Sequence, residues 1–251
     1  MLDNLFIQVY HPHTMHPPDS PFEKSSSAGH RRAVIACATV IEELQPHLPA
    51  GTTCQVLDFG LHIRPQKLKQ ALQETIDTLA PEVDVILLGY GLCSLAIVGL
   101  EARGCALVVP KVDDCIAIFL GSDAAYREQS RREPGTYYLT KGWIEAGDDP
   151  FSEYDGLVER YGKEKARWLM SKMLNHYTRL ALINTGQYEI ERYRAYSRAQ
   201  AARFDLRYEE IDGSNGLILK MLRGPWDDDF VVAHPGQTIA YLDFKSPRLS
   251  L

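Results

Sequence analysis

Short apolar runs alternate along the chain with longer segments in which hydrophobic residues recur every three or four positions. The apolar runs predict strands buried on both faces, at residues 33–36, 83–88 and 106–109. Residues 65–80 predict an amphipathic helix, because leucine and isoleucine recur on one helical face after an initial proline. Alternating strands and helices indicate right-handed βαβ units and a mainly parallel sheet.

The same alternation returns in the second half of the chain. From residue 163 the pattern predicts a helix, a strand near residues 180–184, a long polar-faced helix over 188–204, and then a strand, a helix and a strand. We therefore predict an α/β fold with mainly parallel, Rossmann-like sheets and helices on both faces. The two lobes, of about 31–125 and 165–251, would lie around a cleft.

Two segments depart from this alternation. Residues 1–30 are rich in Pro, His and Ser and predict a partly flexible N-terminal arm, whose His11, His13 and His16 we expect to be solvated. Residues 126–164 are rich in aromatic and charged residues. They predict an excursion that contains a short strand, GTYYLT, and a loop able to cover a cleft.

Composition narrows the class of protein. A chain of 251 residues with 45% hydrophobic and 24% charged residues is typical of a globular protein that can bury a large core. A net charge of -6 without a basic stripe argues against nucleic acid as a partner. We find neither an apolar run long enough to span a bilayer nor a secretory leader. We expect a cytoplasmic protein that acts on a small molecule.

Three of the five cysteines share one place in the pattern. Cys37, Cys93 and Cys115 each follow a predicted strand, and the carboxyl ends of parallel strands meet at one edge of a sheet. We therefore expect these thiols to converge. Cys54 begins a strand and Cys105 precedes one, which places both towards the opposite edge.

Converging thiols suggest a metal centre. We expect each to lie at a helix N-terminus, where the partial positive charge lowers a thiol pKa. Three thiolates suit a [4Fe-4S] cluster with one free iron, our preferred cofactor, or a zinc ion with an open position. The alternative is three independent cysteines that only fill the core.

Further candidates lie near the same predicted edge. His62 follows a strand and Asp114 precedes Cys115, so both are acid–base candidates, with helix capping the alternative for Asp114. Tyr90, between two glycines, could contact the substrate.

The second half of the chain contributes four more candidates. His176 is a possible catalytic acid and Arg179 a possible clamp for an anion. Lys141 and Trp143, in YYLTKGW, could close over a bound small molecule.

Several segments resemble a bacterial and archaeal family, the domain-of-unknown-function family numbered sixteen thirty-eight: IACATVIEEL, LDFGLH, LLGYGLC, VPKVDDCIAIFLGS, PGTYYLTKGW and HYTRLALINTG. The resemblance covers about residues 33 to 240, and the family's recurring cysteines fall on Cys37, Cys93 and Cys115. Members often occur near corrinoid-dependent methyltransferase systems, which implies one-carbon metabolism. A looser similarity to enzymes such as quinolinate synthase implies a four-iron cluster whose free iron polarises the substrate.

These observations favour an enzyme in which a three-cysteine metal site polarises a small polar substrate, with lyase, dehydratase or desulfidase chemistry. One alternative is an accessory protein that carries a metal, cluster or small molecule to a corrinoid-dependent methyl-transfer system. Another is metal-free thiol chemistry, which needs one cysteine with a perturbed pKa.

Overall fold

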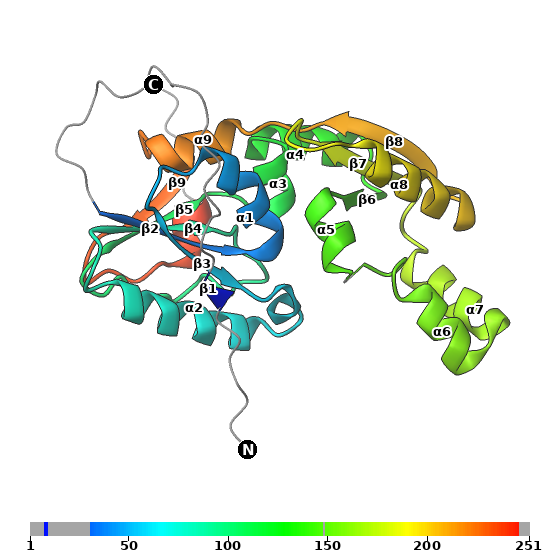
Figure 1. The fold of residues 1–251 in the computed structure, drawn as a ribbon, viewed down its shortest axis with the longest axis horizontal. Coiled ribbons are helices and arrows are strands. Elements are labelled where there is room, and N and C mark those ends of the chain that lie inside the picture. The colour runs from blue at the N-terminus through cyan, green and yellow to red at the C-terminus, as the bar shows by residue number, and fades with distance from the viewer. Residues whose placement is uncertain (1–7, 10–30, 148, 246–251) are drawn as a thin grey trace.

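The fold is built on two sheets that lie next to each other, as the computed structural model shows for residues 8–9, 31–147 and 149–245 (Figure 1). The first sheet has the order β1-β3-β2-β4-β5-β9, in which β3, β2, β4 and β5 are parallel and the two edge strands antiparallel. Its strands are β1 (Gln8–Val9), β2 (Arg32–Cys37), β3 (Thr53–Leu57), β4 (Val85–Gly89), β5 (Ala106–Pro110) and β9 (Phe230–Ala233).

The second sheet has three parallel strands in the order β6-β7-β8. They are β6 (Thr136–Leu139), β7 (Arg179–Asn184) and β8 (Arg207–Asp212). Both sheets arise from apolar runs joined mostly by helical crossovers, so the predicted α/β fold with mostly parallel strands is confirmed.

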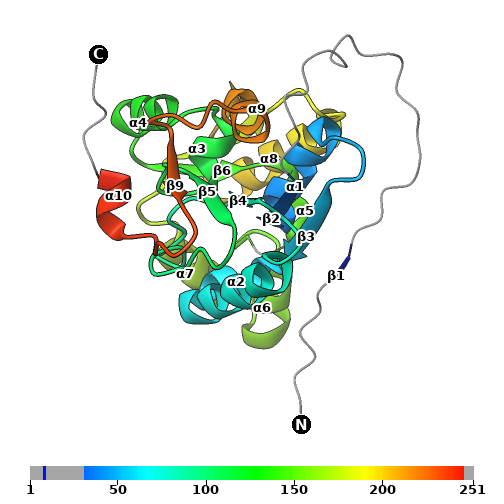
Figure 2. The same ribbon diagram turned by 90° about the vertical axis from the view of Figure 1, so that its left-hand side faces the viewer.

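Helices cover both faces of the first sheet (Figure 2). One face carries α2 (Pro65–Leu79), while α1 (Ala38–Leu44) and α9 (Gly216–Arg223) lie on the other. The other helical elements of this half are η1 (Gln45–His47), η2 (Phe59–Ile63), α3 (Cys115–Phe119), α4 (Asp123–Arg132) and α10 (Tyr241–Lys245). No helix in the described ranges is both long and apolar enough to cross a membrane.

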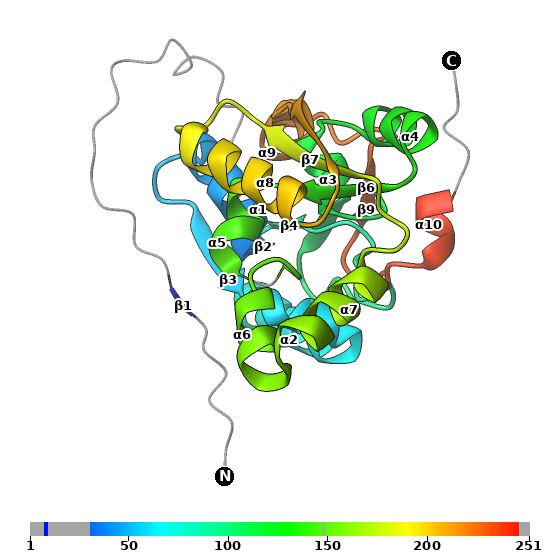
Figure 3. The same cartoon turned by 90° about the vertical axis from the view of Figure 1, so that its right-hand side faces the viewer.

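The second sheet carries its own helices. These are α5 (Lys141–Ala146), α6 (Tyr154–Tyr161), α7 (Lys163–Met173) and α8 (Glu191–Arg203). The α6–α7 hairpin projects away from the strands, whereas α8 packs along β7 and β8 (Figure 3).

Strand β7 joins the two halves because it is buried on both faces. Ala181 and Ile183 belong to the core of the first sheet, whereas Leu180 and Leu182 belong to a second core with residues of α7 and α8. Successive side chains of a strand point to opposite faces, so one strand serves both cores. The halves are therefore packed together through continuous apolar contacts.

The boundaries of the lobes differ from those predicted. Strand β9 and helix α10 return to the first half, where β9 pairs with β5 through Val232 and Val108, instead of completing a second lobe. Within the predicted excursion, GTYYLT forms β6, which is an edge strand of the second sheet. The apolar sequence of β9 can bury either against β5 or in a second lobe, and the pattern alone does not choose. The histidines at positions 11, 13 and 16 lie outside the described residues.

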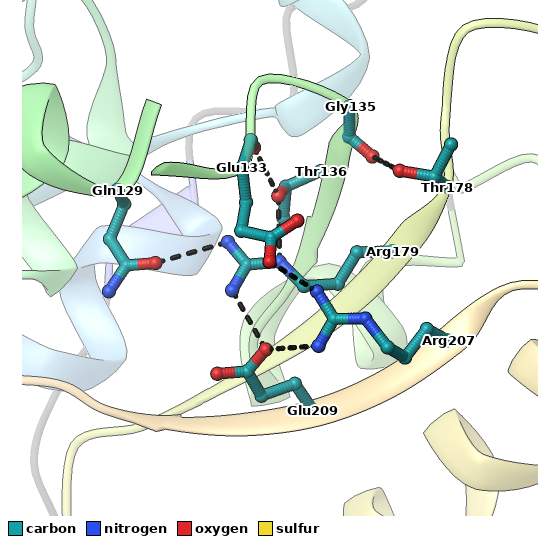
Figure 4. A network of polar contacts seen from close by, with 8 residues as sticks. All are labelled: Gln129, Glu133, Gly135, Thr136, Thr178, Arg179, Arg207 and Glu209. Atoms are coloured by element: carbon teal, nitrogen blue, oxygen red, sulfur yellow. Dashed lines mark hydrogen bonds and ion pairs between the residues drawn. The ribbon is translucent and has the colours of Figure 1, made fainter. Parts of the chain in front are cut away.

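A buried arginine fixes the amino ends of the second sheet (Figure 4). Arg179, the first residue of β7, is 2% exposed. Its guanidinium donates to Thr136 at 2.8 Å, Glu209 at 3.0 Å and Gln129 at 3.0 Å. Arg207 adds ion pairs to Glu209 at 2.7 Å and to Glu133 at 2.6 Å. The network therefore ties α4 to all three strands.

We expect the Arg179→Leu variant to lose about 3 kcal/mol of unfolding free energy, because a buried network loses its central charge. The matched control is Arg207→Leu, whose side chain is 51% exposed and contacts the same Glu209. It should lose less than about 1 kcal/mol, as exposed ion pairs do. Urea unfolding of both variants measures the difference, and equal losses would contradict a special role for Arg179.

Candidate functional site

The junctions after β2, β4 and β5 place Cys37, Cys93 and Cys115 at one edge of the first sheet. Cys37 is the last residue of β2, Cys93 lies in the turn after β4, and Cys115 begins α3. All three are buried free thiols. Ionisation of any one would disfavour ionisation of its neighbours, since the charge of Cys37 raises the pKa of both others. The structure therefore brings the three sulfurs into electrostatic range.

The remaining two cysteines lie at the other edge. Cys54 belongs to the start of β3 and Cys105 immediately precedes β5, so both are at amino ends of parallel strands. Cys54 is half-buried and Cys105 is buried. Neither appears among the charges that act on the three converging thiols. They serve as internal controls for the site.

Gly91 allows the junctions after β4 and β5 to touch. A Cβ atom at Gly91 would lie 2.8 Å from the Val112 carbonyl oxygen and 2.9 Å from the Asp114 amide nitrogen, closer than real Cβ contacts. Two backbone hydrogen bonds follow from this approach: Leu92 N–H donates to Val112 at 2.9 Å and Cys93 N–H to Asp113 at 3.1 Å. The missing side chain therefore positions Cys93 beside the segment that leads to Cys115.

The prediction of a helix that begins at Cys93 is wrong. Residues 93–99 form turns, and Cys93, Ser94 and Leu95 have φ angles of 43°, 55° and 69°. Residues other than glycine enter this left-handed region singly, at a cost of roughly 1–2 kcal/mol each, because Cβ approaches the following carbonyl oxygen. Three in succession mean that the surrounding packing holds the cysteine loop in a strained conformation, as occurs at functional sites.

The thiol pKa values also differ from the prediction. Burial is the largest cause in each case and raises the pKa of Cys37, Cys93 and Cys115 above the ordinary value. Helix α1 has only 7 residues, α3 only 5, and Cys93 precedes no helix, so the helix dipole is too weak to offset desolvation. Without a bound cation the three groups are neutral thiols at neutral pH.

Aromatic side chains with unpaired polar atoms surround the thiols. Tyr90 is fully buried, and its hydroxyl has no hydrogen-bond partner among the described residues. Burial, followed by the charges of the three cysteines, raises its pKa well above the ordinary value. The Trp143 indole N–H lies beside Cys115 and lowers that thiol's pKa, although it does not reach hydrogen-bond geometry.

Trp143 reaches the cysteines from the second half of the molecule. It lies in the first turn of α5, whose N-cap Thr140 accepts a hydrogen bond from the Trp143 amide at 3.3 Å. The neighbouring Gly142 packs on α1, where a Cβ would lie 2.8 Å from the Cα of Thr39. The Thr39 hydroxyl in turn lies 3.0 Å from the Cys37 sulfur. A glycine contact between the halves thus sets the position of this tryptophan.

His62 is a neutral base held next to the same cluster. Its Nδ1 lies 2.8 Å from the Phe59 carbonyl oxygen, which can only accept, so Nδ1 carries the proton. The opposite nitrogen, Nε2, is buried without a partner in the described part of the chain. Burial lowers the His62 pKa, more than the Phe59 hydrogen bond raises it. The ring stacks on Tyr90 at 6.0 Å and lies tilted against Phe59 at 5.1 Å.

A cavity of about 390 Å³ lies beside Cys115, with walls from both halves of the molecule. Asp114 lines it and also caps α3 by accepting a hydrogen bond from the Ile116 amide at 2.9 Å, as the capping interpretation predicts. Burial raises the Asp114 pKa, and the carboxylate raises the pKa of Cys93 and Cys115 in turn. Asp114 therefore connects the cavity with the thiols.

Three predicted site residues lie apart from the thiols. His176 is exposed in the loop before β7, and Arg179 is bound in its internal network at the amino edge of the second sheet. Lys141 forms ion pairs with Glu42 and Glu145. Burial lowers the Lys141 pKa, but those two carboxylates outweigh burial and raise it. These charges are occupied in joining α1, α5 and the second sheet.

Phe59 and Tyr138 belong to the site although the sequence analysis did not select them. Phe59 contacts both His62 and Trp143, the latter ring at 5.2 Å, and Tyr138 lines the cavity. Both lie at or near the carboxyl end of a strand, so the rule that selected the cysteines would also have found them.

Ser94 offers a direct test of the strained turn, because its side chain is exposed. We expect Ser94→Gly to raise the unfolding free energy by roughly 0.5–1 kcal/mol, since relief of the left-handed strain exceeds the entropy cost of glycine. Ser94→Ala keeps the strain and should change little, while Ser94→Val should destabilise. Chemical denaturation measures all three, and an unchanged Ser94→Gly variant would exclude a strained turn.

A model of one protein family matches residues 56–222, which include Cys93, Cys115 and Trp143 but not Cys37. The family is described as a protein of unknown function, DUF1638. Comparisons with curated proteins and with solved structures found no match. Because the matched region spans more than half of the 251 residues, the chain belongs to the DUF1638 family.

Proposed function

We propose that this protein is an enzyme that binds a [4Fe-4S] cluster through Cys37, Cys93 and Cys115 and uses it to polarise a small polar substrate. The observation that carries the proposal is the convergence of three buried free thiols from three separate junctions. The unpaired Tyr90 hydroxyl and His62 Nε2 nearby add to it, because buried polar atoms normally have partners. A bound group would supply them.

Three thiols suit a four-iron cluster, and a single zinc ion is the second candidate. Zinc requires all its ligands to converge on one point, with sulfurs about 2.3 Å away. Each cysteine of a four-iron cluster binds a different iron, so its thiols lie further apart. Three cysteine ligands would also leave one iron open.

The residues around the thiols divide the proton chemistry between them. A cluster with an open iron supplies a Lewis acid that polarises a substrate oxygen or sulfur. Tyr90 keeps its proton because its pKa is raised, so it can donate to a developing negative charge. His62 has a free lone pair on Nε2 and a lowered pKa, so it can accept a proton. A hydrogen-bond donor and a proton acceptor whose rings stack at 6.0 Å suit lyase or dehydratase chemistry.

Trp143 and Asp114 would act around these groups. The Trp143 N–H beside Cys115 can donate to a thiolate sulfur, as donors around metal-bound sulfurs commonly do. Asp114 lines the adjoining cavity, together with Tyr137 and Tyr138 of the 126–164 segment. Residues of this segment thus line the cavity, as expected of a segment beside an active site. The alternative is an accessory carrier for a corrinoid-dependent methyl-transfer system.

The metal-free alternative has less support. Thiol catalysis needs a thiolate, and burial raises the pKa of all five cysteines. A bound cation, in contrast, would displace the protons from neutral thiols.

Iron and sulfide analysis of protein purified without oxygen tests the proposal. We expect about four irons and four sulfides per chain, with the absorption of a cluster. Cys93→Ala should lose both, because one ligand is removed. The matched control is Cys105→Ala, another buried thiol that lies at the opposite sheet edge. It should retain the full content.

Two other outcomes would contradict the cluster. Zinc without iron would replace the cluster with a hydrolytic or methyl-transfer centre. If wild-type protein contains neither metal nor sulfide and the Cys93→Ala variant folds normally, the three cysteines only fill the core.

Alkylation of the metal-free protein tests the thiol protonation. Because burial raises the pKa of Cys54 to about 11, its thiolate fraction at pH 7 is smaller than that of an ordinary cysteine. Burial also raises the pKa of Cys93 and of Cys115. Labelling by iodoacetamide, followed by mass spectrometry, should therefore be slow at pH 7 and rise about tenfold per pH unit towards pH 9. A cysteine that labels fully near pH 6 would support metal-free thiol chemistry instead.

A further inference from the structure

The cavity beside Cys115 has an unusual lining. Five of its lining side chains are aromatic: Tyr126, Tyr137, Tyr138, Trp143 and Tyr177. Two are carboxylates, Asp114 and Glu133. No lysine, arginine or histidine lines it in the described part of the chain. Its size of about 390 Å³ is in the range of small-molecule sites.

Only one of the two carboxylates forms an ion pair among the described residues. Glu133 pairs with Arg207 at 2.6 Å. Asp114 has no ion pair among the described residues, and the neighbouring Lys245 contacts Asp113 at 3.4 Å. The cavity is therefore lined by one carboxylate, adjacent to Cys115 in the chain, that has no ion pair among the described residues.

The guanidinium behind the cavity does not change this balance. Arg179 lies close enough to Tyr138 to lower the pKa of that phenol. Its nitrogens are nevertheless bound to Thr136, Glu209 and Gln129, so its charge is matched by Glu209 and its donors are occupied. A bound anion would have no free cationic donor in this wall.

We propose that the cavity binds an organic ammonium cation, held by the carboxylate of Asp114 and by the faces of the surrounding aromatic rings. Aromatic rings attract alkylated ammonium groups through their negative faces, most strongly where water is excluded. The inference rests on the proposed function in one respect, that the cation is the substrate of the cysteine site. Trp143 borders both the cavity and Cys115, so a ligand in the cavity would lie next to the metal site.

Calorimetric titration with choline and with 3,3-dimethylbutan-1-ol tests the inference. The two probes have nearly the same shape, but only choline carries the positive charge. We expect saturable binding of choline and at least about tenfold weaker binding of the neutral alcohol, because only the cation gains from the rings and the carboxylate.

Two neighbouring variants complete the experiment. Asp114→Asn removes the charge while asparagine still caps α3, so the helix start is preserved. It should bind choline about tenfold more weakly. Asp113→Asn removes an adjacent carboxylate that does not line the cavity, and it should bind choline as the wild type does.

Measurement of iron on the same samples separates this inference from the cluster. Choline binding that persists in the metal-free Cys93→Ala variant would support the cation site whether or not the cluster exists. Equal binding of choline and the neutral alcohol, or an unchanged affinity in Asp114→Asn, would overturn it. Failure of the wild type to bind choline at millimolar concentration would do the same.

Discussion

The contact between Gly142 and Thr39 is the point on which the candidate site depends. It lets α5 of the second half approach α1 of the first without an intervening side chain. The approach places Trp143 beside Cys115 and brings the second sheet over the carboxyl edge of the first. Strand β7, buried on both faces, holds the same arrangement through apolar contacts. All three thiols are buried in this arrangement.

Exclusion of water has a direct consequence for the thiols. Burial raises their pKa values, and each thiolate would further oppose ionisation of the next. The short helices at Cys37 and Cys115 do not reverse this effect. A buried group of this kind is stable as neutral thiols or as thiolates with a cation, because isolated buried charges are costly. The packing therefore makes ionisation of the site conditional on a bound cation.

The sequence was informative where a residue's role follows from its place on a strand. Cys37, Cys93 and Cys115 each follow an apolar run, and they converge because β2, β4 and β5 are parallel neighbours in one sheet. The left-handed turn at Cys93 could not be foreseen, because Ser94 and Leu95 carry no local signal such as glycine.

Register and long-range pairing set the other limits of the sequence analysis. Arg179 begins β7 at the amino edge of the second sheet, and its guanidinium, predicted to clamp an anion, is used in an internal network. β9 pairs with β5, and its sequence does not indicate which of two apolar surfaces it packs against. Neither result is local, since each is decided by residues far away along the chain.

Charge connects the two proposals about this site. Asp114 lines the cavity and also raises the pKa of Cys93 and Cys115, so negative charge in the cavity and on the sulfurs is mutually unfavourable. A positive group at either place would relieve this repulsion, at the sulfurs as metal or in the cavity as a cationic ligand. Binding at the two places should therefore be coupled, and each site should alter the affinity of the other by the same factor, because linked equilibria are reciprocal.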